Sequence, residues 1–160
     1  MIPLLNGDIG ALQARLCRIA TRVDIATYNV HIPHIAQFLR CKQTRLIIGA
    51  PEAIGERQAT ITSSAKSVAS AFPQVEVRIL LGSHIKLMIF ARPKGLSAII
   101  GSQNLGLGHP YELAVELRAG EALPLANIYQ RLWKEARPVK ALDMQNIALR
   151  LRTSEFEVRS

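Results

Sequence analysis

The sequence predicts an α/β fold in which a mixed β-sheet is flanked by helices on both faces. Apolar, strand-like segments alternate with amphipathic segments over residues 8–81, a pattern typical of helices that cover neighbouring strands. Two further apolar segments, 84–91 and 96–102, are separated by a turn-forming Arg-Pro-Lys-Gly and should therefore pair as an antiparallel hairpin. Crossovers early in the chain and a hairpin late in the chain together favour a mixed sheet.

Short runs rich in Val, Ile and Leu mark the strands. We expect them at residues 23–30, 45–50, 75–81, 84–91, 96–102 and 112–118. Helices should begin near Asp8, which can cap the first, and near Pro33, which suits a first helical turn. The expected helices cover residues 8–22, 33–39, 55–71, 121–136 and 140–151. We find no internal repeat or linker, so residues 1–160 are expected to form a single domain.

Composition narrows the classes of protein. The 160 residues are 49% hydrophobic with a mean hydropathy of +0.15, which is enough apolar material for a core. No apolar run reaches the roughly 18 residues that a membrane span needs, and the N-terminus lacks the features of a signal peptide. Two cysteines without metal-like spacing indicate reduced thiols. We therefore expect a cytoplasmic protein without membrane association.

The net charge of +8 and the pI of about 10.1 predict a polyanionic partner. Both halves of the chain are basic, so the charge is not confined to a tail. One candidate surface consists of basic residues that recur every three positions, which suits either a phosphate-tracking face or a solvated helix side. These residues are Arg131, Lys134, Arg137 and Lys140.

Four polar side chains stand at the ends of the expected hairpin. His84 and Lys86 share one face at the start of the first strand, because side chains alternate along a strand. Ser102 and Asn104 follow where the second strand ends. If the two strands pair through the turn between them, all four side chains converge at one edge of the sheet.

This set of side chains suits a phosphate. Histidine can attack phosphorus or move a proton near neutral pH, and lysine supplies positive charge for the developing oxyanion. A serine hydroxyl and an asparagine amide can donate hydrogen bonds to the other oxygens. No carboxylate cluster or His/Cys set accompanies them, so we expect metal-independent phosphoryl transfer with neither metal nor cofactor.

The segment resembles the phospholipase D superfamily, whose signature is H-x-K-x4-D-x6-G-S-x-N. Here the signature appears as His84-Ile85-Lys86 and Gly101-Ser102-Gln103-Asn104, with a slightly longer interval between the two parts. Ala91 stands at the position of the signature aspartate.

The resemblance extends beyond the signature. "YELAVELRAGEALPLANIYQRLW" looks like the superfamily's strand with a leading glutamate, followed by a helix that ends in Leu-Trp. It places Glu112 in the acidic role, with Glu116 as the alternative. "VDIATYNV" and "RLIIGA" look like the first two strands of that fold. The resemblance covers about residues 8–136 and leaves 138–160 as a C-terminal helix and tail.

The resemblance also implies an assembly, since the chain holds one H-x-K and single-motif members resemble small bacterial endonucleases that form homodimers. His84 of one subunit would be the nucleophile, and His84 of the other would protonate the leaving oxygen. Lys86 and Asn104 would hold phosphate oxygens, while Ser102 and Glu112 would orient the histidines.

Three functions follow from these expectations. The first is a metal-independent nuclease that cleaves nucleic acid, DNA rather than RNA, in a dimeric site. The second is a catalytically weak or inactive nucleic-acid-binding module of the same fold, motivated by Ala91. The third is a phospholipase D or phosphatidyl transferase, which is less favoured because such enzymes usually carry two motifs in a longer chain.

Overall fold

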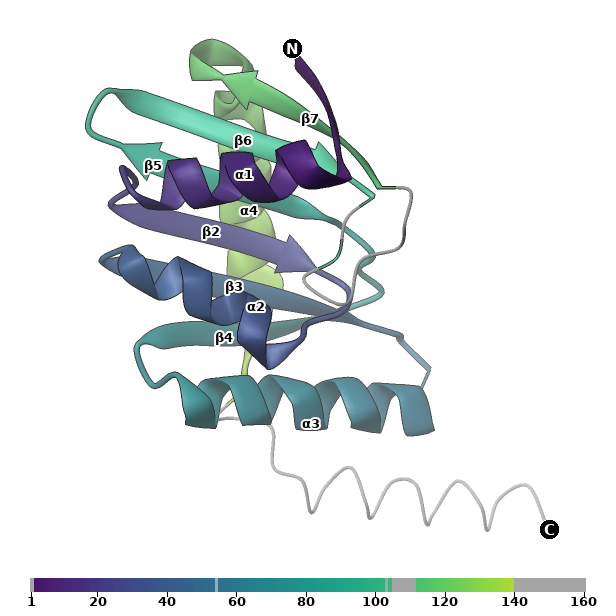
Figure 1. Cartoon of the computed structure of the whole chain (residues 1–160). Coiled ribbons are helices and arrows are strands. Elements are labelled where there is room, and N and C mark those ends of the chain that lie inside the picture. The colour runs from purple at the N-terminus through teal and green to yellow at the C-terminus, as the bar shows by residue number, and fades with distance from the viewer. Residues whose placement is uncertain (1, 54, 103, 105–111, 140–160) are drawn as a thin grey trace, which may run out of the picture.

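A computed structural model describes residues 2–53, 55–102, 104 and 112–139. They form a mixed sheet with the strand order β1-β7-β6-β5-β2-β3-β4-β8, covered by helices on both faces (Figure 1). The expected fold class is therefore confirmed. The helix expected at 140–151 lies outside the described residues. Among the described helices, none is both long and apolar enough to span a membrane.

Each expected strand is present, and two edge strands are added. β2, β3 and β4 run parallel to one another, whereas the other neighbouring strands pair antiparallel. The added strands, β1 and β8, are short and contain proline, so they form by pairing with β7 and β4 rather than from a local pattern. The bounds are β1 Ile2–Leu5, β2 Arg22–Thr27, β3 Gln43–Ala50, β4 Val75–Leu81, β5 Leu87–Arg92, β6 Gly95–Gly101, β7 Leu113–Arg118 and β8 Arg137–Pro138.

β5 begins at Leu87, so our placement of His84 and Lys86 within a strand is wrong. In the sheet, β3 and β2 lie between β4 and β5, and the chain must pass both before it can pair again. Three strand spacings amount to about 14 Å, which takes four or five extended residues. Residues 82–86 make this passage, and Gly82 begins it at φ +71°.

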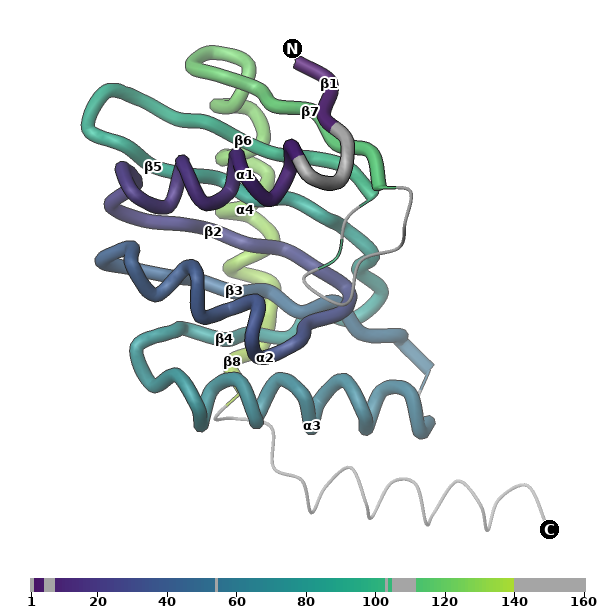
Figure 2. Tube along the Cα trace, in the orientation of Figure 1, coloured from purple at the N-terminus to yellow at the C-terminus, as the bar shows by residue number. Residues whose placement is uncertain are grey.

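Helices α1, α2 and α3 cover one face of the sheet, and α4 covers the other (Figures 1 and 2). Adjacent residues of β3 alternate between the two cores, with Leu46 and Ile48 facing α1 and α3 and Ile47 facing α4. The first helix begins before Asp8 and ends short of residue 22, in contrast to our prediction. The bounds are α1 Asn6–Cys17, α2 Ile32–Ile35, α3 Glu56–Ala71 and α4 Leu123–Glu135, with short 3₁₀ turns at Ala36–Arg40 and Ala119–Glu121.

A buried ion pair lies beneath α4. Arg45 on β3 donates to both carboxylate oxygens of Asp24 on β2, at 2.7 and 2.8 Å. The Arg45 guanidinium also lies 5.3 Å from the Tyr129 ring centre and 5.0 Å from that of Trp133, both on α4. The Tyr129 hydroxyl donates to the Arg45 carbonyl at 3.1 Å. The pair thus joins two parallel strands to the helix that covers them.

Removing the carboxylate should be strongly destabilising. Asp24→Ala leaves the Arg45 guanidinium buried without its partner, and we expect a loss of about 3–5 kcal/mol in the free energy of unfolding, measured by urea denaturation. Arg22→Ala is the control, because Arg22 contacts the same carboxylate at 3.2 Å but its side chain is 37% exposed. It should change stability by about 1 kcal/mol or less. Equal losses in both variants would contradict this assignment.

Candidate active site

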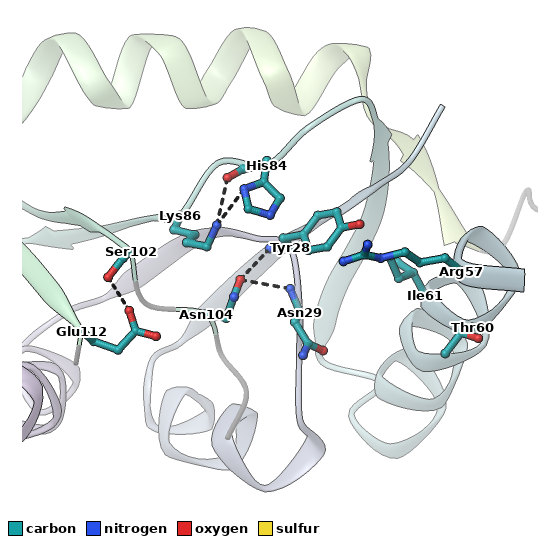
Figure 3. A pocket seen from close by; sticks show the side chains of 10 residues that line it. All are labelled: Tyr28, Asn29, Arg57, Thr60, Ile61, His84, Lys86, Ser102, Asn104 and Glu112. Atoms are coloured by element: carbon teal, nitrogen blue, oxygen red, sulfur yellow. Dashed lines mark hydrogen bonds between the residues drawn. The ribbon is translucent and has the colours of Figure 1, made fainter. Parts of the chain in front are cut away.

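A pocket of about 730 Å³ opens at one edge of the sheet (Figure 3). It lies where β2 and β6 end, where β5 and β7 begin, and beside the first turns of α3. All five residues expected to be catalytic line it. The hairpin predicted this convergence for four of them, and the resemblance implied a place there for Glu112. The lining residues are Tyr28, Asn29, Arg57, Thr60, Ile61, His84, Lys86, Ser102, Asn104 and Glu112.

His84 and Lys86 contact each other directly. The Lys86 Nζ lies 3.0 Å from the His84 Nδ1 and 3.3 Å from the His84 carbonyl oxygen. When the ammonium donates to Nδ1, a neutral imidazole carries its proton on Nε2. Burial lowers the pKa of Lys86 below its ordinary value, and the negative charge of Glu112 partly opposes this shift.

Ser102 and Glu112 join the end of β6 to the start of β7. The Ser102 hydroxyl donates to the Glu112 carboxylate and accepts from the Leu113 amide at 3.1 Å. The Ser102 amide donates to the Leu113 carbonyl at 3.0 Å. A Cβ on Gly101 would lie 2.3 Å from that carbonyl oxygen, so a residue larger than glycine does not fit directly before Ser102.

Glu112, rather than Glu116, lies in the pocket. Glu112 is 5% exposed and directly precedes β7. Glu116 lies within β7, where its carboxylate pairs with Arg118 at 2.7 Å, and this pair lowers the pKa of Glu116. Of the two glutamates that the resemblance offered, Glu112 therefore lines the pocket and Glu116 does not.

Asn104 is held by the backbone that follows β2. Its Oδ1 accepts from the amides of Tyr28 and Asn29, each at 3.3 Å. With Oδ1 engaged in this way, the amide NH₂ is the group that Asn104 can offer to an anion.

Sequence reasoning missed the part of the pocket formed by Tyr28, Asn29 and α3. The Tyr28 ring centre lies 4.3 Å from that of His84, and the Arg57 guanidinium lies 5.0 Å from the Tyr28 ring centre. The sequence does contain a signal for Tyr28 and Asn29, because this polar pair directly follows the apolar run that forms β2. Nothing in the local sequence marks Arg57.

The expected basic surface is not part of this pocket. Arg131, Lys134 and Arg137 are exposed on α4 and β8, and none of them lines the pocket. Lys140 lies outside the described residues. Over the part of the chain that the structure describes, no group of three His, Cys, Asp or Glu side chains is placed to hold a metal ion.

Ala91 lies far from the pocket along β5. It pairs with Leu96 on β6 and with Arg22 on β2, near the hairpin turn and the start of β2. The pocket is at the other end of these strands. A side chain at position 91 therefore has no direct contact with the pocket residues.

No protein-family model matches the sequence, and no curated protein matches it. Solved structures match by fold. NucT from Helicobacter pylori aligns with a TM-score of 0.62 and 13% identity, over 86% of this chain and 97% of NucT. TrmBL2, an archaeal chromatin protein described as showing a novel mode of DNA binding, aligns with a TM-score of 0.56 and 11% identity, over 86% of this chain and 53% of its own.

A mutant of yeast tyrosyl-DNA phosphodiesterase 1 aligns with a TM-score of only 0.43 and 15% identity, over 64% of this chain and 27% of its own, a likeness too weak to establish a shared fold. At the identities of NucT and TrmBL2, the likeness establishes the fold. The chain has the phospholipase D-like fold that its H-x-K and G-S-x-N segments implied.

A side chain at Gly49 should displace the segment that carries His84. A Cβ there would lie 2.0 Å from the Ser83 carbonyl oxygen, which is backbone and cannot turn aside. We expect Gly49→Ala to lower the free energy of unfolding by about 1–3 kcal/mol, as overpacking does, and to shift the His84 ring resonances in NMR spectra.

Gly10→Ala is the matched control for this substitution, since a Cβ at Gly10 in α1 meets nothing within 4 Å. It should be neutral or stabilising by up to about 1 kcal/mol. Unchanged His84 resonances in Gly49→Ala would show that the segment does not rest on β3.

The pKa of Lys86 offers a test of the pocket's electrostatics. Because burial disfavours the ammonium, the Nζ should titrate below 10.5, its ordinary value, when followed by NMR of the lysine side chain. Glu112→Gln removes the opposing charge and should lower this pKa further. A midpoint at or above 10.5, or a rise in Glu112→Gln, would contradict the arrangement described here.

Proposed function

We propose that the chain is a metal-independent phosphodiesterase that cleaves nucleic acid, DNA in preference to RNA, through a phosphohistidine intermediate. The observation that carries this proposal is the convergence of the five motif side chains in one pocket, which are His84, Lys86, Ser102, Asn104 and Glu112. The net charge of +8 and the fold shared with NucT support it.

The proposed chemistry has two steps. The His84 Nε2 attacks phosphorus, a P–N bond forms, and the P–O bond to the leaving oxygen breaks as that oxygen takes a proton. Water then attacks the phosphohistidine, a P–O bond forms, and the P–N bond breaks to release the phosphate and the free imidazole. The proton that water loses goes to the group that protonated the leaving oxygen in the first step. Lys86 and the Asn104 amide donate to the non-bridging oxygens and stabilise their charge in both steps.

The resting hydrogen bond between Lys86 and His84 has a consequence for the first step. While Lys86 donates to Nδ1, the neutral ring has its proton on Nε2, the atom that must attack. A bound phosphate would draw the ammonium to its own oxygens and free Nδ1 to carry the proton. Glu112, held by Ser102, is the carboxylate proposed to orient the ring in that state.

We further propose that the working unit is a two-fold homodimer with a shared site. The nucleophile and the acid for the leaving oxygen lie on opposite sides of phosphorus, so one imidazole cannot serve both roles. The sequence contains one H-x-K, and a second copy of the chain would supply the other histidine.

A second candidate is a nucleic-acid-binding module without turnover. It is favoured by the fold shared with TrmBL2, described as a chromatin protein, and by Ala91 at the signature's aspartate position. Ala91 lies at the far end of β5 from the pocket, which favours retained chemistry over its loss. The exposed residues Arg131, Lys134 and Arg137 are proposed as additional phosphate contacts under either candidate.

Cleavage of supercoiled plasmid in excess chelator separates the two candidates. We expect nicking by the wild type, and loss of at least about 10³-fold in His84→Ala, because removal of a covalent nucleophile eliminates the pathway. His34→Ala is the control, since His34 does not line the pocket. Strict dependence on added magnesium, or equal activity of His84→Ala, would refute the histidine mechanism. Binding of plasmid without nicking would favour the second candidate.

Subunit mixing tests the shared site. Wild type exchanged with excess His84→Ala subunits should lose activity faster than the wild-type fraction falls, because each mixed dimer lacks one of the two histidines. Activity that declines in proportion to that fraction, or a fully active monomer in sedimentation, would show that each chain carries a complete site.

A further inference from the structure

Arg57 and Tyr28 extend the pocket beyond the motif residues. Tyr28 follows the end of β2, and Arg57 lies in the first turn of α3. The Tyr28 ring contacts the His84 ring on one side and the Arg57 guanidinium on the other, at 4.3 and 5.0 Å (Figure 3). The three side chains therefore lie in a row along the pocket, with the Tyr28 ring between His84 and Arg57.

The charge of Arg57 is available to a ligand. The side chain is exposed, and within the described ranges no carboxylate forms a salt bridge with it. Its contact with Tyr28 holds the planar guanidinium in place. The N–H groups of a guanidinium are arranged so that two of them can donate to two oxygens of one phosphate. An exposed arginine with these contacts does little for the core, so its position is better explained by what enters the pocket.

We propose that Arg57 binds the backbone phosphate next to the scissile one, and that Tyr28 sets the spacing between the two phosphate positions. This inference rests on the proposed function and deepens it. A single phosphodiester can engage His84, Lys86 and Asn104. A second phosphate at Arg57 requires a ligand with at least two phosphates, as successive nucleotides of a strand provide. The pocket is thereby built for a nucleic-acid strand rather than for a lone diester.

Short oligonucleotides test this subsite directly. A thymidine dinucleotide has one phosphate and a thymidine trinucleotide has two, so the ratio of their affinities reports the second phosphate position. Binding is followed by NMR titration at low salt in a His84→Asn background, which prevents turnover. We expect the trinucleotide to bind about tenfold more tightly, the scale of one charge-assisted hydrogen bond.

Arg57→Gln in the same background should bring this ratio close to one. Arg40→Gln is the control. It removes the same charge from an exposed position just before the start of β3, at the end of the strands away from the pocket, and should leave the ratio unchanged. A trinucleotide with one uncharged methylphosphonate linkage should bind like the dinucleotide.

Two results would overturn the subsite. The first is a ratio that Arg57→Gln does not change, which includes equal weakening of both oligonucleotides, the signature of general attraction. The second is no binding of either oligonucleotide at low salt. Plasmid cleavage with a ratio insensitive to Arg57 would remove the subsite and leave the proposed function. A ratio that depends on Arg57, in a protein that does not cleave plasmid, would support the second phosphate position and refute the proposed cleavage activity.

Discussion

The antiparallel pairing of β5 with both β2 and β6 is the constraint on which the pocket depends. Because β5 runs opposite to both neighbours, its start lies beside their ends. The segment before β5 carries His84 and Lys86, the end of β2 leads into Tyr28, and the end of β6 leads into Ser102 and Asn104. Residues distant in the sequence thus meet at one edge of the sheet.

Hydrogen bonds then fix these strand ends to one another. Asn104 holds the backbone after β2, Ser102 joins β6 to β7, and two glycines permit backbone contacts that a Cβ would prevent. The side chains that would act on a phosphate are therefore held before any ligand arrives, which is what electrostatic preorganisation requires. The exception is the contact of Lys86 with His84, a resting arrangement that a bound phosphate would replace.

The fold by itself does not decide the function. NucT and a chromatin protein described as showing a novel mode of DNA binding share this fold at low identity, so the likeness concerns architecture. What distinguishes one activity from another is the set of side chains at the sheet edge. In this chain that set combines a histidine, a lysine and an asparagine with a buried glutamate, and adds an arginine and a tyrosine that lie outside the H-x-K and G-S-x-N segments.

Local apolar patterns and antiparallel pairing are enough to predict the central strands, the hairpin through the Arg-Pro-Lys-Gly turn, and the convergence of the motif residues. Three other features depend on contacts between elements distant in the sequence. β1 and β8 form because neighbouring strands offer free edges, and residues 82–86 stay outside a strand because the chain must pass β3 and β2. Arg57 reaches the pocket because α3 packs beside β4, a contact between elements that no local pattern encodes.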